Sequence, residues 1–133
     1  MPLRYRLIAR RSRIEGRGIF AAETLPARRK LGEVTGRIRP LRASLKTVAT
    51  QKRIYLVDLG RAQALDCSEG NVFRFLNHSC QPNCYLRQCG LKLEVYSLRK
   101  IKTGEELTID YIETPHRHGM TCRCKLPGCR GIL

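Results

Sequence analysis

The chain is a succession of short apolar segments, each separated from the next by glycine, proline or polar residues. Alternation of apolar and polar positions, or a short apolar run that ends at a glycine, is typical of β-strands. Strands are therefore expected at 3–9, 16–22, 30–38 (interrupted by its two glycines), 54–59, 63–67, 85–88, 92–98 and 107–111. Cys89 and Gly90 are expected to form the turn of a β-hairpin. This pattern predicts a mostly β fold of small curved sheets with little helix.

Residues 39–53 are the one stretch expected to be helical, although Thr47, Val48 and Thr50 have poor helix propensity. We interpret this stretch as a variable insert in a single domain that covers residues 1–114. At 133 residues the chain is long enough for one hydrophobic core but not for two. The composition changes from residue 114 onward, so residues 115–133 are expected to be a tail without a core of its own.

The richest concentration of chemically capable side chains lies in residues 71–84, where an apolar run ends in a polar cluster. A proline near the end of this segment disfavours helical geometry before it, so a short helix or turn that opens into a loop is expected. The amides of Asn77 and Asn83, the imidazole of His78 and the thiol of Cys80 could together hold a polar cofactor and a metal ion. Equally, a loop of turn-forming residues can use such groups to cap its own backbone.

The composition favours a globular protein with reduced thiols. Hydrophobic residues make up 42% of the chain, and no apolar run is long enough to span a membrane. Residues 1–13 are cationic and no apolar run follows them, so we expect an intracellular protein with neither a signal peptide nor a membrane anchor. Seven cysteines in such a compartment favour a metal site or free thiols over a disulfide framework.

The formal net charge of +15 is concentrated in the N-terminal part of the chain. Residues 1–53 carry fifteen Lys and Arg against three acidic residues, whereas residues 54–133 carry eleven against eight. The basic N-terminal half could bind the phosphates of a nucleic acid. It could also be solvated arginine decoration, because only Tyr5 and Phe20 are interleaved with the basic residues there.

Three cysteines, Cys122, Cys124 and Cys129, lie within eight residues of one another in the tail. Three thiols at this spacing need a fourth ligand to complete a tetrahedral zinc site. His116, His118 or a cysteine from elsewhere in the chain could supply it. Zinc is favoured over free buried thiols, because little else would order so short a segment.

Several motifs, in a fixed order, resemble those of SET-domain protein lysine methyltransferases that carry a post-SET tail. They are the segments 16–21 (GRGIFA), 55–58 (YLVD), 74–84 (RFLNHSCQPNC), 104–111 (GEELTIDY), 122–124 (CRC) and 129–131 (CRG). The resemblance runs nearly end to end, and on it the chain is identified as a member of this family. It implies a SET-domain fold of small twisted sheets in which the C-terminal segment passes through a loop to form a pseudoknot. This threading would bring the 71–84 segment beside Tyr111.

The family's reaction moves a methyl group from S-adenosylmethionine to a neutral lysine ε-amine by in-line displacement. By resemblance, Tyr111 is the catalytic tyrosine, and Tyr55 lines the lysine channel and orients the amine. Gly16, Arg17 and Gly18 match the loop that receives the methionine part of the cofactor, where Arg17 could pair with its carboxylate. Without the resemblance, Tyr111 would be interpreted as a half-buried tyrosine at the end of a strand.

Further cofactor-binding residues are implied in the 71–84 segment. Asn77 and His78 match residues that hold the cofactor through side-chain and backbone hydrogen bonds. Arg74 is grouped with them, and Arg74 and Asp110 are expected to fix this segment against the last strand. A plain surface salt bridge is the alternative for each of these two charged residues.

The resemblance also supplies the fourth ligand of a structural zinc ion, because in the family the cysteine of the central motif joins the three tail cysteines. The implied ligands are Cys80, Cys122, Cys124 and Cys129. The zinc would fold the tail over the active site, with Ile132 or Leu133 as the apolar cover of the lysine channel. The other cysteines are interpreted as ordinary buried or edge thiols: Cys67, Cys84 and Cys89.

Ile109 departs from the family pattern. It stands two residues before the catalytic tyrosine, where the family usually has Phe or Tyr and where side-chain size and hydroxyl content govern how many methyl groups fit. An aliphatic residue leaves room and binds no water, so di- or trimethylation is predicted rather than monomethylation.

The expected substrate is a histone or another basic protein associated with nucleic acid. Such a target is cationic, so a chain of charge +15 would bind it through a local acidic groove. The acidic residues available for such a groove are Asp58, Asp66, Glu69, Glu94, Glu105, Glu106, Asp110 and Glu113. The alternative function is a catalytically inactive, zinc-stapled module that binds peptide or nucleic acid, which the missing aromatic at Ile109 leaves open.

The expected setting follows from the same resemblance. We expect no membrane contact, and a monomer or homodimer that finds its substrate with its own surface. The nucleus and chromatin are expected if the source is eukaryotic, and the cytoplasm or nucleoid if it is bacterial.

Overall fold

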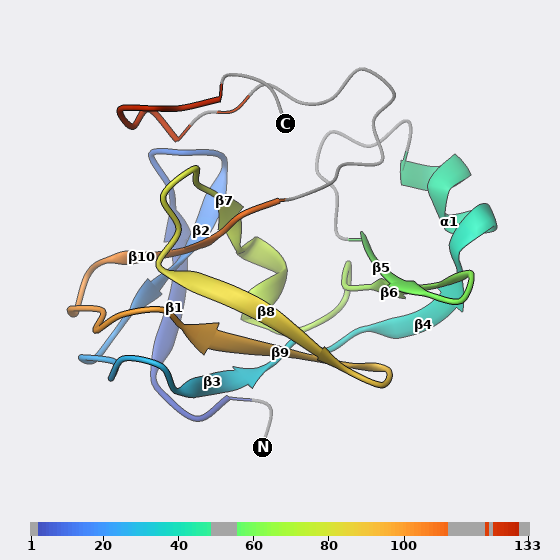
Figure 1. Ribbon diagram of the computed structural model, residues 1–133, viewed down its shortest axis with the longest axis horizontal. Helices are drawn as coiled ribbons and strands as arrows, with labels where there is room; N and C mark the ends of the chain where they lie inside the picture. Colours follow the sequence, from blue (N-terminus) through green and yellow to red (C-terminus); the bar gives the residue numbers. More distant parts are fainter. Residues whose placement is uncertain (1–2, 49–55, 112–121, 123, 131–133) are drawn as a thin grey trace.

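The computed structural model describes residues 3–48, 56–111, 122 and 124–130, which form a mostly β structure (Figure 1). Helical geometry in this part of the chain is limited to α1 (Leu41–Val48) and the 3-10 turn η1 (Val72–Phe75). The strands are β1 (Leu7–Arg11), β2 (Arg17–Ala21), β3 (Lys30–Glu33), β4 (Arg37–Pro40), β5 (Leu56–Gly60), β6 (Gln63–Asp66), β7 (Asn77–His78), β8 (Cys84–Cys89), β9 (Lys92–Ser97) and β10 (Glu106–Ile109). Neither helical segment has the length and apolar character needed to cross a membrane.

The described strands form three small sheets, with the strand orders β1-β2-β10-β7, β3-β9-β8 and β4-β6-β5. In the first sheet, β10 runs antiparallel to β2 and parallel to β7. The last strand is thus inserted between an early strand and the 71–84 segment, in agreement with the expected SET-domain fold of small sheets and little helix.

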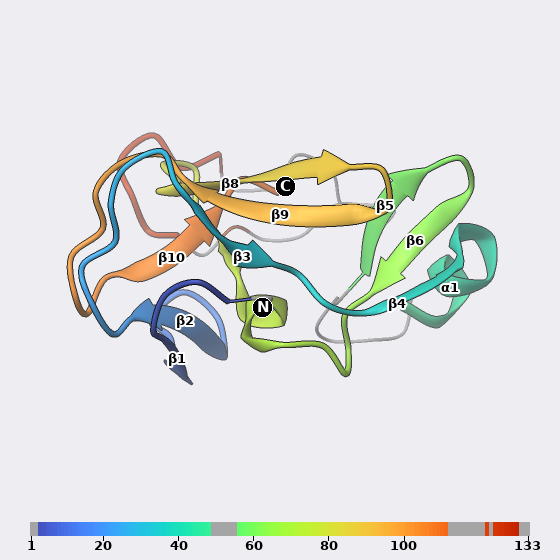
Figure 2. The same ribbon diagram turned by 90° about the horizontal axis from the view of Figure 1, so that it is seen from below.

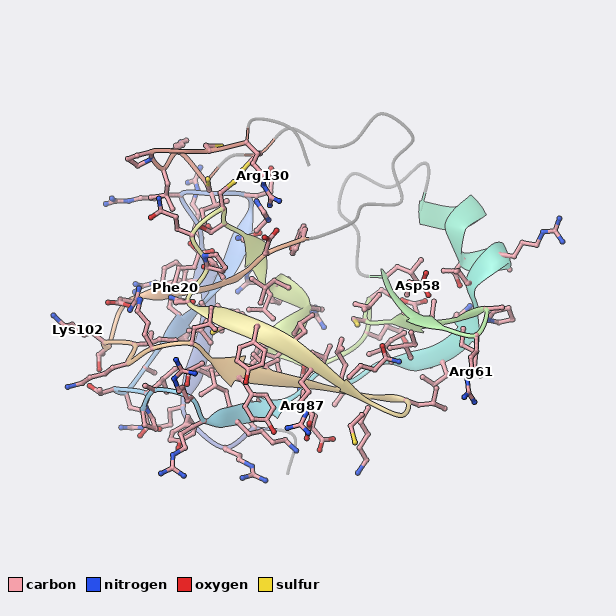
Figure 3. All side chains as sticks on the ribbon, viewed as in Figure 1. Phe20, Asp58, Arg61, Arg87, Lys102 and Arg130 are labelled. Atoms are coloured by element: carbon pink, nitrogen blue, oxygen red, sulfur yellow. The ribbon has the colours of Figure 1, made fainter. Side chains whose placement is uncertain are left out.

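The third sheet and the first sheet lie on opposite sides of the molecule (Figure 1). The third sheet and α1 lie at one end, and the described tail residues lie beside the first sheet at the other (Figures 1 and 2). Asp58 of β5 and Arg61 of the turn between β5 and β6 lie on the side with the third sheet, away from Arg130 of the tail (Figure 3).

The main hydrophobic core collects apolar side chains from the first two sheets and from η1. Ile19 of β2 and Leu107 of β10 are partners across their two strands, and both are fully buried. Leu31 of β3, Val95 of β9 and Phe73 of η1 belong to the same core. Full burial of one such side chain contributes about 1.5–3 kcal/mol, so packing in this core holds β10 in the middle of its sheet.

The single strand predicted for residues 30–38 is wrong, because the chain forms β3 and β4 in two different sheets. The Val34 N–H still donates to a carbonyl of β9 at 2.8 Å, whereas pairing with β6 starts at Arg37. Gly36 lies at this crossing, where a Cβ would come within 2.5 Å of the Asp66 backbone oxygen. A glycine is therefore needed for the chain to pass so close to β6.

The helix predicted for residues 39–53 begins later than expected, at Leu41. Arg39 and Pro40 instead pair with β6 as the end of β4. β4 is an edge strand of its sheet, and an edge strand tolerates a proline. The Ser44 hydroxyl donates to the Pro40 carbonyl at 2.9 Å and closes the first turn of α1. α1 ends at Val48, and residues 49–53 lie outside the described part of the chain.

The predicted short helix in the 71–84 segment is confirmed as η1. The Asn71 side chain caps η1 by accepting a hydrogen bond from the Phe73 N–H at 3.3 Å. Phe73 and Phe75 are buried and anchor the turn in the core. The chain then extends into β7, so the residues that follow η1 lie next to β10.

The predicted hairpin is also confirmed. β8 and β9 pair in register from Cys84 opposite Ser97 to Cys89 opposite Lys92. Gly90 occupies the turn with a φ of +61°, a left-handed conformation that glycine adopts without strain.

Candidate active site and metal-binding cluster

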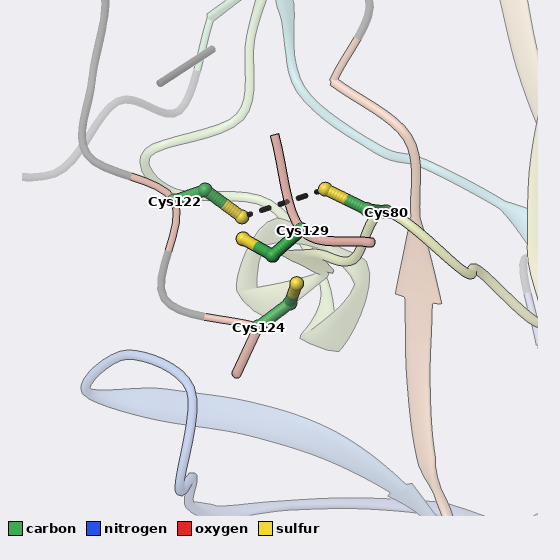
Figure 4. Close-up of side chains that lie close together, drawn as sticks. All are labelled: Cys80, Cys122, Cys124 and Cys129. Atoms are coloured by element: carbon green, nitrogen blue, oxygen red, sulfur yellow. Dashed lines mark hydrogen bonds between the residues drawn. The ribbon is translucent and has the colours of Figure 1, made fainter. Parts of the chain in front are cut away.

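Four cysteines meet at the junction of the tail and the loop after β7. The sulfur atoms of Cys80, Cys122, Cys124 and Cys129 all lie within 4.8 Å of one another (Figure 4). The Cys80 and Cys122 sulfurs are 3.7 Å apart. Zinc–sulfur bonds of about 2.3 Å in a tetrahedron place the sulfurs about 3.8 Å apart, so the four thiols fit a metal ion of this kind. The predicted clustering of Cys80 with the tail cysteines is therefore confirmed.

The electrostatics of the cluster also suit a cation. Hydrogen bonds from the Arg130 backbone N–H and from His78 lower the pKa of Cys80 to about 7. Burial alone would raise the pKa of the Cys124 thiol. Hydrogen bonds from the backbone of Cys80 and Leu126 outweigh this effect and lower the pKa of Cys124 to about 6. Burial raises the pKa of Cys122 to about 12. Because neighbouring thiolates repel one another, a divalent metal is the usual partner that lets four such thiols ionise together.

Arg130 connects this cluster to the end of β10. Its backbone N–H donates to the Cys80 sulfur at 3.3 Å, and its guanidinium donates to the Asp110 carboxylate at 2.5 Å. The Asp110 carboxylate raises the pKa of Arg130 above its ordinary value. Arg130 belongs to the 129–131 motif but was assigned no role from the sequence, because an arginine beside a cysteine carries no local signal of such a contact.

His78 lies between the metal-binding cluster and Tyr111. The Tyr111 backbone N–H donates to His78 Nδ1 at 2.9 Å, while His78 Nε2 lies 3.4 Å from the Cys80 sulfur. The Arg130 guanidinium nitrogen also lies 3.2 Å from Nε2, so Nδ1 faces a backbone donor and Nε2 faces both an arginine donor and the cysteine sulfur. The ring is 5% exposed, so these partners are not replaced by water.

Tyr111 follows β10, and its hydroxyl donates to the Leu76 carbonyl in the turn between η1 and β7. Its ring lies 5.5 Å from the His78 ring, centroid to centroid. Ile109 is 7% exposed and is the partner of His78 in the parallel pairing of β7 and β10. The predicted neighbourhood of Tyr111 and the 71–84 segment is thus confirmed.

The glycine loop before β2 lies against the same segment. The Asn77 amide nitrogen donates to the carbonyls of Glu15 and Arg17 at 3.1 Å each. Gly16 has a φ of +42°, which places the loop in a left-handed bend between these two carbonyls. The Arg17 guanidinium lies 5.5 Å from the Phe75 ring centroid. Three segments therefore converge from distant parts of the chain: residues 15–18, 76–80 and 109–111.

The remaining predicted site residues lie elsewhere. Arg74 donates to the Gly70 carbonyl at 2.6 Å and covers the Phe75 ring at 4.6 Å, so these contacts stabilise η1. Cys67 and Cys84 are buried and Cys89 is exposed, as expected of ordinary buried or edge thiols. Outside the described residues lie Tyr55, His116, His118, Ile132 and Leu133.

Comparison with known proteins matches residues 16–112 to the SET domain family. The histone-lysine N-methyltransferase set-2 of Caenorhabditis elegans is 37% identical over 133 residues, which cover 92% of this chain and 9% of that protein. The histone-lysine N-methyltransferase SETD1 of Drosophila melanogaster is 34% identical over 133 residues, which cover 92% of this chain and 8% of that protein. A Schizosaccharomyces pombe protein is named histone-lysine N-methyltransferase, H3 lysine-4 specific. It is 34% identical over 132 residues, which cover 92% of this chain and 14% of that protein. The chain thus spans between 8% and 14% of the length of these relatives.

Proposed function

The chain belongs to the SET-domain family, and from this membership we propose that it is a protein lysine N-methyltransferase that uses S-adenosylmethionine. The observation that carries the proposal is the convergence of the glycine loop, Asn77, His78 and Tyr111 at one place. These groups come from three distant segments of the chain, and a module that only binds a partner has no need of all of them.

The donor set of the site fits S-adenosylmethionine, which supplies an electrophilic methyl group on a sulfonium. Arg17 stands in the glycine loop with an exposed side chain and would pair with the cofactor carboxylate. The Tyr111 hydroxyl donates to the Leu76 carbonyl, and these two groups would provide oxygen atoms near the transferring methyl group. Gly16, Gly18, Asn77 and His78 are the other residues that we assign to cofactor binding. Arg74 is proposed to support them through η1, where its contacts with Gly70 and Phe75 lie.

The residues around the target lysine must accept a neutral amine. Deprotonating a free lysine at pH 7 costs about 4–5 kcal/mol, and an apolar channel that disfavours the ammonium offsets part of this. Tyr111 and Tyr55 are the proposed catalytic residues that orient the amine. Ile109 and Leu133 are the proposed apolar lining of the channel, and the aliphatic Ile109 favours di- or trimethylation.

Histone H3 is the substrate that the relatives indicate first. The Schizosaccharomyces pombe relative is named for lysine 4 of H3, and the Caenorhabditis elegans relative is named as a histone-lysine methyltransferase. We therefore propose an H3 tail as the target, with another basic protein associated with nucleic acid as the second candidate. These relatives also support a chromatin location in a eukaryotic nucleus.

The metal of the cysteine cluster is proposed to be zinc in a structural role. A set of four thiolates is typical of structural zinc, and it leaves no coordination position for substrate. Residues 115–133 would then be a post-SET tail that the metal folds against the domain of residues 1–114. A Cys80→Ser variant is expected to lose zinc and activity together, as measured by metal content and methyl transfer. Full zinc occupancy in this variant would assign the fourth ligand to His116 or His118.

Two further properties belong to the same proposal. The basic N-terminal half is proposed to contact nucleic acid, and the protein is proposed to act as a monomer or homodimer.

The second candidate function is a catalytically inactive, zinc-stapled binding module. One observation favours it: Ile109 is aliphatic at a position where the family usually has an aromatic residue.

The test is methyl transfer from labelled S-adenosylmethionine to H3 peptides, core histones, nucleosomes and basic DNA-associated proteins, with zinc-replete protein. Tyr111→Phe keeps the ring but removes the hydroxyl and should lower incorporation at least about 100-fold while leaving cofactor binding intact. Incorporation that Tyr111→Phe does not reduce would refute the assigned role of this tyrosine. An absence of both incorporation and cofactor binding would favour the inactive module.

A further inference from the structure

Glu106, the first residue of β10, has its carboxylate turned toward the glycine loop rather than toward solvent. The Ser12 hydroxyl lies 2.7 Å and 2.9 Å from its two oxygens, and the Asn77 amide nitrogen donates to Oε2 at 2.9 Å. A carboxylate is an acceptor only, so the hydroxyl and the amide must both donate. The side chain is therefore held in one orientation by two donors from different segments.

Both donors also hold the backbone of the glycine loop. The Ser12 N–H donates to the Gly16 carbonyl at 2.8 Å, and the Ser12 hydroxyl accepts from the Ile14 N–H at 2.9 Å. The Asn77 amide nitrogen, as described above, also donates to carbonyls on either side of Gly16. Glu106 thus lies at the centre of a network in which every member touches residues 12–18.

Close packing ties the carboxylate to the loop as well. A Cβ built at Gly18 would collide with the Glu106 carboxylate, so no other residue type fits at this position without moving Glu106. The loop backbone and the carboxylate therefore lie in direct contact. A residue with a Cβ at position 18 would have to displace this carboxylate from its hydrogen bonds with Ser12 and Asn77.

We propose that Glu106 is a positioning residue that presets the glycine loop for S-adenosylmethionine, through Ser12 and Asn77 and without touching the cofactor. The inference rests on the proposed function. A loop already held in its binding conformation loses less conformational freedom when the cofactor binds, so the network should act on cofactor affinity. It should leave the rate at saturating cofactor almost unchanged, because Tyr111 lies at the other end of β10.

Glu106→Gln keeps the size of the side chain but replaces one acceptor oxygen with a donor. The neighbouring Glu105→Gln is a matched control, because it removes the same charge from a partly exposed carboxylate that pairs with Arg99 at 2.9 Å rather than with the side chains of the glycine loop. Calorimetry should give a dissociation constant for S-adenosylmethionine about tenfold higher in Glu106→Gln, and within about twofold of wild type in Glu105→Gln. In Glu106→Gln, the KM for the cofactor should rise while kcat stays within about twofold.

Ser12→Ala provides an independent test that spares β10. It should weaken cofactor binding in the same direction, and the double variant with Glu106→Gln should bind no more weakly than Glu106→Gln alone, because both changes break one network. Unchanged cofactor affinity in Ser12→Ala and Glu106→Gln, beside normal wild-type binding, would overturn this inference alone. A wild-type protein that does not bind S-adenosylmethionine would overturn the proposed function together with the inference.

Discussion

His78 shows how one side chain can serve two sites at once. Its Nδ1 accepts from the Tyr111 backbone N–H, and its Nε2 lies 3.4 Å from the sulfur of Cys80 and 3.2 Å from the Arg130 guanidinium. Hydrogen bonds to a coordinating group from outside the ligand shell orient that group and tune the metal. The metal-binding cluster and the proposed catalytic tyrosine are therefore joined through a single buried imidazole.

Two substitutions of His78 separate these contacts. His78→Ala leaves the Tyr111 N–H without its acceptor, which should cost about 1–3 kcal/mol of stability. In His78→Asn the amide oxygen takes the place of Nδ1, so most of that stability should be kept. Both variants lose the hydrogen bond to Cys80 and should release metal to a chelator faster than wild type. Urea unfolding and a colorimetric zinc assay measure the two effects, and equal loss of stability in both variants would contradict the assignment of Nδ1 as the acceptor.

The cysteine pKa values predict how metal affinity depends on pH. Cys80 and Cys124 have pKa values lowered to about 7 and about 6, so they ionise over this range as the pH rises, and protons displace the metal as the pH falls through it. The pKa of Cys122 is raised to about 12, so this thiol still has to lose a proton on binding above pH 7. Zinc affinity, measured by chelator competition, should rise steeply from pH 5 to pH 7 and less steeply from pH 7 to pH 9. A flat profile would contradict ligation by thiolates.

Among the elements, β10 organises most of the site. Its side chains have three different neighbours. Glu106 contacts the glycine loop through Asn77, Leu107 is buried in the core, and Ile109 is the pairing partner of His78. Tyr111 follows two residues later. Because β10 is paired with β2 on one side and β7 on the other, it carries the glycine loop and the 71–84 segment to the same place.

Asn83 secures the loop after β7 to this strand. Its amide donates to the Glu106 carbonyl at 2.8 Å and accepts from the Thr108 N–H at 2.9 Å, and the side chain is buried. Asn83→Ala should therefore destabilise the protein by about 2–4 kcal/mol, because two backbone groups of β10 lose their partners. Gln88→Ala is the control: this amide also bonds backbone carbonyls but is exposed, and water can replace it. Urea unfolding midpoints that shift equally in both variants would refute this account.

The elements show what could be predicted from the sequence and what could not. The 71–84 segment stood out because its polar residue types are concentrated there, and its predicted neighbour Tyr111 followed from the family resemblance. Arg130 was given no site role and Glu106 was named only for an acidic substrate groove, because their contacts depend on where β10 lies between β2 and β7, which no local pattern encodes. The 30–38 segment was predicted as one strand because its apolar pattern does not reveal that the chain changes sheets at Gly36.

At the scale of the whole molecule, the described acidic residues are spread over strands of all three sheets and over the loops between them. Most are paired with nearby basic side chains: Glu94 with Lys30, Asp66 with Arg39, Glu69 with Arg37, Glu105 with Arg99 and Asp110 with Arg130. Basic side chains, by contrast, extend from several sides, as the labelled Arg61, Arg87 and Lys102 show (Figure 3). Among the described residues, the acidic side chains available for the groove expected from the sequence are therefore mostly neutralised by basic partners.

This distribution predicts how methyl transfer should depend on salt and on DNA. A chain of net charge +15 repels an isolated cationic H3 tail, whereas nucleosomal DNA attracts it and brings the same tail close. Methyl transfer to nucleosomes should therefore exceed transfer to the free H3 peptide at low salt. Because the screening length falls to about 8 Å at 0.15 M, this advantage should shrink as salt is added, while transfer to the free peptide should rise. Initial rates over a salt series measure both trends, with a peptide whose flanking basic residues are neutralised as the control. A free-peptide rate that falls with added salt would show that local attraction to an acidic surface outweighs the net repulsion.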